Sequence, residues 1–277
     1  MPKSFSPKFA SCGFFERATM DSIVYLYDGS FEGLLHAVAA AVKSPGEVQG
    51  IYAEQGFSPR IFDTLIHLKT DSGQALRLFA YLKKLKGAAA RFAVNGFLSD
   101  DHEVGRHLYW LVRECLVRGP KATQLYTHDS IRYLDKLAQK VSAEAHRCIG
   151  LIRFRILEDG LQYAPFAPDC NVIGHCARHF RQRLANQRWI LHDIGRNHAL
   201  YWDGKDLQSI TLDDDFTKHV RRAGEIPDAR ISETERHYQK LWQSFHTAIA
   251  NPDRKNLDLQ RRFMPRRYWK YLIEMGP

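Results

Sequence analysis

The sequence predicts an α+β protein with a largely helical N-terminal lobe, an antiparallel sheet in the order strand, strand, helix, three strands, and C-terminal helices. Three observations favour this class. Apolar residues recur at helical spacing through most of the chain before residue 142. After Gly150 they alternate with polar residues, as in a strand with one buried face. The Asp159-Gly160 pair between two such runs is typical of a hairpin turn.

We expect three segments. Residues 1–22 contain no continuous apolar run and form a leader without the features of a signal peptide. Residues 23–142 form the mainly helical lobe, and residues 143–277 form the α+β lobe, which ends in a basic and aromatic tail. A chain of 277 residues suits one large domain or two small ones, so the two lobes could also form one compact unit.

The first lobe should begin with a strand at 23–27. Ser30 then caps a helix, because its hydroxyl accepts a hydrogen bond from a free amide of the first turn. Lys83 and Lys84, followed by Gly87, mark the end of a later helix. We expect the helices of this lobe at 31–42, 59–68, 72–86, 88–98 and 103–118, and a last one that starts at an Asp129 cap and leads into the stretch 143–160.

The second lobe should contain strands at 152–156 and 161–166, a helix at 171–184, and strands at 188–194, 199–202 and 207–212. Residues 213–230 are polar and carry both signs of charge, which favours a mobile loop. Ser232 and Glu235 form a capping box, so a helix should start there. Its apolar stripe comprises Tyr238, Leu241, Trp242, Phe245 and Ile249.

The composition favours a polyanionic partner. Lys and Arg number 40 against 31 Asp and Glu, a net charge of +9, which attracts nucleic acid but is also found in ordinary basic proteins. The five cysteines are an odd number without a C-x-x-C pair, which indicates reduced thiols and a cytoplasmic location. No apolar run approaches the roughly 20 residues of a membrane span.

Arginines in two regions are candidate DNA contacts. Arg153 and Arg155 share one face of the predicted strand, where their guanidinium groups could bind successive phosphates or pair with Glu158 or Asp169. In the tail, cations bind phosphates and aromatic rings stack on exposed bases, or the rings pack the tail onto the body. The full candidate set is Arg147, Arg153, Arg155, His179, Arg261, Arg262, Arg266, Arg267, Tyr268 and Trp269.

Three residues are candidates for acid–base chemistry: Glu144, His146 and Asp193. Glu144 and Arg147 share a helix face, so an ion pair that pins the helix end to the sheet is the alternative. Asp193 lies on the apolar face of its strand and needs a partner there, such as Arg147 or Arg155.

No cofactor or metal site is expected. His175 and His179 have the i, i+4 spacing of metal ligands, but no H-E-x-x-H motif and no second ligand pair accompany them. Walker A, G-x-G-x-x-G and G-x-S-x-G patterns do not occur in the sequence.

Several motifs occur together in a characteristic order. They are YDGSFEGLL (27–35), EAHR (144–147), GLIRFRILEDG followed by YAPFAPDCNV, the pair His179-Phe180, QRWILHD (187–193), LYWDG (200–204) and RKNLDLQRRFMPRRYWKYL (254–272). With this order the chain resembles, from about residue 23 onward, a bacterial family described as probable DNA metabolism protein, a domain of unknown function. The leader at 1–22 departs from that pattern.

The resemblance implies a role in DNA repair or base modification. Proteins of that kind are found beside a radical-SAM protein that carries a helix-hairpin-helix DNA-binding region, and the domain is also fused to an unusual uracil-DNA glycosylase-like protein. We therefore expect a DNA-binding factor that acts with a radical-SAM partner. The alternatives are a cofactor-free enzyme that acts on a nucleotide or modified base through Glu144, His146 and Asp193, or an adaptor that contacts only protein.

Overall fold

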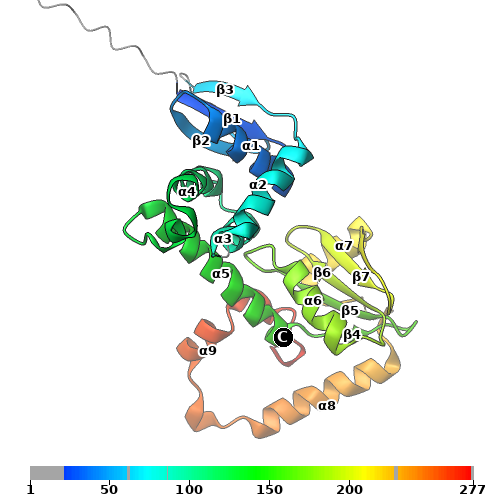
Figure 1. Cartoon of the computed structure of the whole chain (residues 1–277). Helices are drawn as coiled ribbons and strands as arrows, with labels where there is room; N and C mark the ends of the chain where they lie inside the picture. Colours follow the sequence, from blue (N-terminus) through cyan, green and yellow to red (C-terminus); the bar gives the residue numbers. More distant parts are fainter. Residues whose placement is uncertain (1–21, 61–62, 86, 228–229, 276–277) are drawn as a thin grey trace, which may run out of the picture.

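The computed structural model describes residues 22–60, 63–85, 87–227 and 230–275. The chain has an α+β fold in which a three-stranded and a five-stranded sheet lie among helices (Figure 1). The predicted leader, 1–22, lies outside the described residues except for Ser22, the first residue of β1. Within the described part of the chain, no helix combines the length and the apolar character needed to cross a membrane.

The first lobe contains a parallel sheet in the order β2-β1-β3. β1 (Ser22–Tyr27) is the central strand, and its apolar run is buried as parallel strands require. α1 (Phe31–Lys43) is the crossover to β2 (Val48–Ala53), and the Ser30 hydroxyl caps it by accepting a hydrogen bond from the Gly33 amide at 2.9 Å. The predicted strand and the predicted Ser30 cap are both confirmed.

The helix expected at 59–68 is wrong. Asp63–His67 form the strand β3, and residues 61 and 62 lie outside the described ones. Thr64 and Ile66 are β-branched and suit a strand, and β3 pairs in parallel with β1 along its whole length. A parallel edge strand is stabilised by that pairing, which the local sequence does not reveal.

The remaining helices of this lobe are α2 (Ser72–Lys84), α3 (Ala89–Leu98) and α4 (Val104–Arg118), followed by the 3-10 turn η1 (Gly119–Gln124). They confirm the predicted helices to within a few residues. α4 approaches β2 so closely that a Cβ at Gly105 would lie 2.4 Å from the Ile51 carbonyl oxygen. Only glycine fits at this contact between helix and sheet.

α5 (Asp129–Leu151) connects the two lobes. Ile131 and Leu134 in its first half belong to the core of the first lobe, whereas Val141 and Ala145 belong to the core of the second. Figure 1 shows this helix running from one lobe into the other. His128, not Asp129, is its N-cap, with the imidazole accepting from the Ser130 amide.

The second lobe contains a five-stranded sheet in the order β4-β5-β6-β7-β8. Its elements are β4 (Arg155–Ile156), β5 (Gln162–Phe166), α6 (Ile173–Arg183), β6 (Trp189–Asp193), β7 (His198–Trp202) and β8 (Leu207–Ile210). The expectation of a wholly antiparallel sheet is wrong, because β5 and β6 pair in parallel. α6 is the crossover between them, and a strand–helix–strand unit joins parallel strands.

Helices complete the chain after β8. They are α7 (Asp214–Ala223), α8 (Glu233–Ile249), η3 (Pro252–Arg254), α9 (Leu257–Phe263), α10 (Arg266–Trp269) and η4 (Ile273–Met275). α7 replaces most of the loop expected at 213–230; the Asp213 carboxylate caps it and Gly224 ends it in the left-handed region. The Ser232 cap of α8 is confirmed, since its hydroxyl accepts from the Glu235 amide at 3.1 Å.

The last segment returns to the body of the second lobe. Tyr268, Tyr271 and Leu272 are buried. Tyr268 belongs to the core cluster that includes Cys148 of α5, and Tyr271 to the cluster that includes Tyr163 of β5. α8, by contrast, runs along the outside of this lobe (Figure 1), and its only extensive packing among the described elements is against η4. Many side chains of α8 and α9 therefore face solvent.

Candidate functional site

The Glu144 carboxylate is the centre of a buried hydrogen-bond network. It accepts from Arg147 at 2.8 Å, from Arg267 at 2.9 Å, from the Asp169 amide at 2.9 Å and from the Tyr268 hydroxyl. Glu144 itself is 1% exposed. Arg267 also pairs with the Asp169 carboxylate at 3.0 Å. The network thus joins α5, the segment after β5 and α10.

Burial alone would raise the pKa of Glu144, but the hydrogen bonds from Tyr268, Arg147, the Asp169 amide and Arg267 together lower it to about 2. The carboxylate is therefore ionised and has all of its strong donors in place. A group in this state does not accept a proton near neutral pH, so the expected acid–base role of Glu144 has no geometric support. The alternative of an ion pair that pins the helix end describes what the structure contains.

His146 does not join this network. It is exposed on a different face of α5, while Glu144 is buried. Asp193, fully buried, accepts from the Arg196 guanidinium at 2.8 Å and from the amides of Gly195 and Arg196. Its partner is thus Arg196 rather than Arg147 or Arg155. Each of the three predicted catalytic residues has its own environment, and the structure does not bring them together around a common space.

The expectation that Arg153 and Arg155 project from an outward strand face is wrong. α5 continues to Leu151 and β4 contains only Arg155–Ile156, so Arg153 precedes the strand. Arg155 is 4% exposed and donates to the carbonyls of Gly224 and Tyr271 at 3.3 and 3.2 Å. Arg153 pairs with Glu274 at 2.6 Å. Both side chains fix the C-terminal segment to the lobe instead of facing a common groove.

The tail residues divide into an inner and an outer group. Arg267 and Tyr268 belong to the Glu144 network, so Tyr268 is not available to stack on a base. Trp269 is half-buried and donates to the Met264 carbonyl at 2.8 Å. The outer group, Arg261, Arg262 and Arg266, is exposed. Arg261 pairs with Asp258 on its own helix, which is a weak surface contact.

His179 lies on α6 with its ring edge against Phe180, at 5.2 Å between centroids. Its Nε2 is buried without a hydrogen-bond partner. His175, one turn earlier, is exposed. Among the residues that the structure covers, no three His, Cys, Asp or Glu side chains lie close enough to hold a metal ion.

An exposed surface on α8 and α9 was not predicted. We call it the α8–α9 surface, and it combines apolar and aromatic side chains with cations. The stripe of α8 that a globular helix normally buries remains between 40 and 62% exposed, and Phe263 of α9 is 66% exposed. Its members are Tyr238, Leu241, Trp242, Phe245, Ile249, Leu257, Leu259 and Phe263, with the cations Arg254, Lys255, Arg262 and Arg266. None of these four cations has a carboxylate partner among the described residues.

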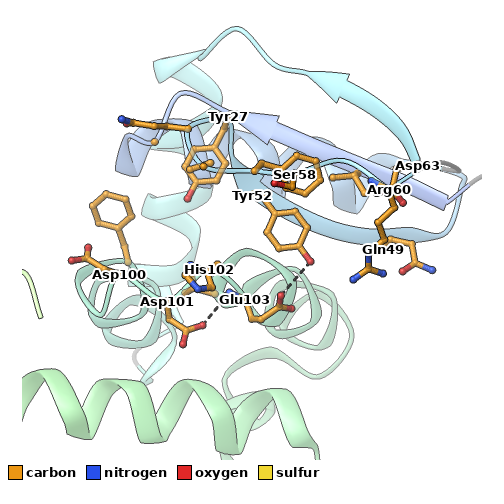
Figure 2. A pocket seen from close by; sticks show the side chains of 18 residues that line it. Tyr27, Gln49, Tyr52, Ser58, Arg60, Asp63, Asp100, Asp101, His102 and Glu103 are labelled. Carbon is orange, nitrogen blue, oxygen red and sulfur yellow. Dashed lines mark hydrogen bonds between the residues drawn. The ribbon is translucent and has the colours of Figure 1, made fainter. Parts of the chain in front are cut away.

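A cavity of about 510 Å³ lies in the first lobe, where the carboxyl ends of β1 and β2 meet the turn between α3 and α4. Tyr27 and Tyr52 line it from the sheet side, and Asp101 and Glu103 from the helix side (Figure 2). Phe57, whose ring stacks on Tyr52, also belongs to the lining. None of these residues was predicted from the sequence to line a site. The apolar run of β1 followed by Asp28-Gly29 was the available signal, because ligands gather at the carboxyl ends of parallel strands.

A family model described as a domain of unknown function, DUF4130, matches residues 102–274. The chain belongs to this family. No curated protein matches the chain. The DUF4130 region contains the Glu144 network, the five-stranded sheet and the α8–α9 surface, whereas most of the cavity lining precedes it.

The net charge of the chain is concentrated in the DUF4130 region. Residues 102–274 contain 29 Lys and Arg against 21 Asp and Glu, whereas residues 1–101 contain 11 against 10. Part of this excess is engaged within the protein, since Arg147 and Arg267 share Glu144 and Arg155 is buried against two carbonyls, whereas Arg254, Lys255, Arg262 and Arg266 are exposed. This is the distribution that attracts a polyanion to one part of a protein.

Proposed function

We propose that the protein is a DNA-binding factor in DNA repair or base modification and that it acts with a radical-SAM partner protein. Three features support the proposal. They are the resemblance to the DNA metabolism family, the concentration of positive charge in the DUF4130 region, and the α8–α9 surface. The proposed DNA contacts differ from those expected from the sequence, because Arg147, Arg153, Arg155 and Arg267 are engaged within the protein.

The observation that carries the proposal is the presence of exposed rings on α8 and α9 together with cations on α9 and α10 that have no acidic partner among the described residues. Single-stranded DNA presents phosphates and unstacked bases together, and proteins bind it with cations beside aromatic side chains. Tyr238, Phe245 and Phe263 offer exposed rings, and Arg262 and Arg266 offer guanidinium groups without acidic partners. A base stacked on an aromatic ring contributes roughly 1–3 kcal/mol to the binding free energy. Each phosphate neutralised on a single strand adds about −0.7 to the slope of log Kobs against log salt.

Fluorescence anisotropy of a labelled single-stranded oligonucleotide over a salt series tests the proposal. The Arg262→Ala/Arg266→Ala double variant should reduce the slope of log Kobs against log salt by about 1.4, because two phosphate contacts are lost. The matched control removes two exposed cations of the first lobe, in an Arg77→Ala/Lys84→Ala variant, and should leave the slope unchanged. Absence of binding by the unaltered protein at low salt, or equal slopes for both variants, would contradict DNA binding through this surface.

A protein adaptor is the second candidate function, and one observation favours it. Leu241, Ile249, Leu257 and Leu259 are between 44 and 62% exposed, and aliphatic side chains do not stack on bases. Exposed apolar stripes of this kind dock against protein grooves. A Leu241→Asp/Ile249→Asp variant separates the two candidates: loss of binding to the radical-SAM partner with unchanged DNA affinity supports the adaptor, and the opposite result supports direct DNA binding.

A further inference from the structure

The cavity in the first lobe has the position and size of a small-molecule site. Its volume of about 510 Å³ lies within the roughly 300–1,000 Å³ of such sites. Its lining extends along the sheet from Gln49 and Asp63, near the amino ends of β2 and β3, to Tyr27 and Ala53 at the carboxyl ends of β1 and β2. Residues 100–103 line its opposite side. The DNA contacts proposed above lie on other elements, so this cavity needs a separate explanation.

Tyr27 presents to the cavity a hydroxyl that has no partner among the described residues. The residue is 7% exposed, and its hydroxyl makes no hydrogen bond with any described residue. Figure 2 shows the hydroxyl directed into the cavity between the sheet and the turn that carries Asp100, Asp101 and His102. Burial, with a smaller contribution from the Asp28 charge, raises the pKa of Tyr27 to about 12, so the hydroxyl keeps its proton. The hydroxyl reaches the space of the cavity and is free to donate a hydrogen bond to a ligand there.

On the helix side of the cavity, the carboxylates of Asp101 and Glu103 can accept further hydrogen bonds. Asp101 accepts from the Tyr133 hydroxyl at 2.8 Å and from the Glu103 amide at 3.0 Å. Glu103 accepts only a long hydrogen bond, 3.3 Å, from the Tyr52 hydroxyl. Neither pairs with a cation among the described residues, unlike Asp100, which is bound by Arg196. A carboxylate offers about four acceptor positions, so both can receive N–H donors from a ligand.

The sheet side of the cavity supplies a flat aromatic wall. The rings of Tyr52 and Phe57 are stacked, with centroids 5.1 Å apart and planes at 20°. Both residues line the cavity. A planar ligand would pack against such a wall by offset stacking or by edge-to-face contact. Tyr27 therefore offers a donor, Asp101 and Glu103 offer carboxylate acceptors, and Tyr52 and Phe57 offer apolar ring surface. The other polar side chains of the lining are those of Gln49, Gln55, Ser58, Arg60, Asp63, Asp100 and His102.

We propose that this cavity binds a nucleoside whose base carries an exocyclic amine. The base packs beside Tyr52 and Phe57, its amine donates to Glu103 or Asp101, and a ring nitrogen accepts from the Tyr27 hydroxyl. Beside Asp101 and Glu103, a base with an amine and a neighbouring ring acceptor matches these groups, whereas a carbonyl in the place of the amine would set oxygen against a carboxylate. The site is independent of DNA binding by the α8–α9 surface, and either proposal can fail without the other.

Isothermal titration calorimetry with matched nucleosides tests the proposal. Adenosine is compared with purine riboside, which lacks the amine, and cytidine with uridine, which has a carbonyl in its place. In at least one pair the amine-bearing nucleoside should bind about tenfold more tightly, as expected when a charged acceptor loses its donor. Spermidine, an amine without a ring, should bind more weakly than that nucleoside. Equal affinities within both pairs, no binding at millimolar concentrations, or tightest binding by spermidine would overturn the proposal.

Two variants locate the site. Tyr27→Phe removes only the hydroxyl and should lower the affinity for the preferred nucleoside about fivefold. Glu103→Gln should lower this affinity about tenfold. Tyr126→Phe is the matched control, because Tyr126 is 52% exposed and does not line the cavity. Glu103 is partly exposed, so its variant keeps the test available if Tyr27→Phe does not fold. Unchanged affinity in both variants would overturn the assignment of the nucleoside to this cavity.

Discussion

Replacement of Glu144 by glutamine should destabilise the protein strongly and change how its stability depends on pH. The pKa of Glu144 in the folded protein is about 2 against an ordinary value of 4.5. This difference corresponds to about 3 kcal/mol of stability when the group is ionised. The Glu144→Gln variant also leaves the Arg147 and Arg267 charges without their shared partner. We therefore expect the free energy of unfolding at pH 7 to fall by about 3–5 kcal/mol.

The sign of the pH dependence follows from the direction of the shift. Because the pKa is lowered on folding, the stabilisation by Glu144 is present above pH 4.5 and is lost as the pH falls from 4.5 toward 2. Urea denaturation at pH 7 and pH ~3 should show that the unaltered protein loses about 2 kcal/mol more over this range than Glu144→Gln does.

The control for this measurement is Glu114→Gln. Glu114 pairs with Arg118 at 2.7 Å on the outside of α4, and such a surface pair contributes about 0–1 kcal/mol. The proposed role of Glu144 would be refuted if Glu144→Gln lowered the free energy of unfolding at pH 7 by no more than Glu114→Gln does. It would also be refuted if Glu144→Gln and the unaltered protein lost the same stability on acidification.

Three further substitutions test contacts of the second lobe by urea denaturation. Arg155→Ala should lower the free energy of unfolding by about 2–4 kcal/mol, because two buried carbonyls lose their donor and a cavity forms. Arg155→Met should lower it less, because the methionine side chain fills most of the same space. Gly224→Ala should cost at least about 2 kcal/mol, since the residue has φ +75° and a Cβ would lie 2.2 Å from the Lys270 carbonyl oxygen; a neutral effect would contradict this geometry. Ser232→Ala should cost about 1 kcal/mol through loss of the α8 cap, and a Ser232→Asp variant should retain the stability.

The sequence predicts the elements that local signals define. The Ser30 and Ser232 caps, the turn at Asp159-Gly160 and most helices of the first lobe are found where the pattern places them. Each depends on a hydrogen bond or a backbone conformation within a few residues. The α+β class follows from the change in apolar period after α5 and is also confirmed.

What the sequence does not predict depends on contacts between distant residues. Alternation in the segment 152–156 suggested exposed arginines, but Arg155 is buried because the C-terminal segment packs over it and supplies the Tyr271 carbonyl. The parallel pairing of β5 and β6 could have been predicted, since α6 separates them and a crossover helix joins parallel strands.

The candidate site illustrates the same limit. The pattern predicts an ion pair of Glu144 with Arg147 as one alternative and places Arg267 and Tyr268 among the DNA contacts of the tail, yet only the fold shows that all four residues meet in one network. The stripe of α8 has the spacing of a buried helix face, and nothing in its own residues shows that the body of the protein leaves it uncovered. The spacing of residues shows which side chains lie on the same face of a helix, and tertiary packing decides whether that face is exposed to solvent.

The closure of the Glu144 network by residues about 120 positions downstream has a consequence for biosynthesis. While the ribosome is still translating α6 to α9, the nascent α5 already carries Glu144, but Arg267 and Tyr268 have not been made. The second lobe therefore reaches its native packing only after the chain has emerged to residue 268 or beyond. In a chain that ends before residue 267, Glu144 would lack Arg267 and Tyr268 as partners, and core residues of the second lobe would stay exposed to chaperones and proteases. Truncated chains should therefore be degraded faster than the full-length protein.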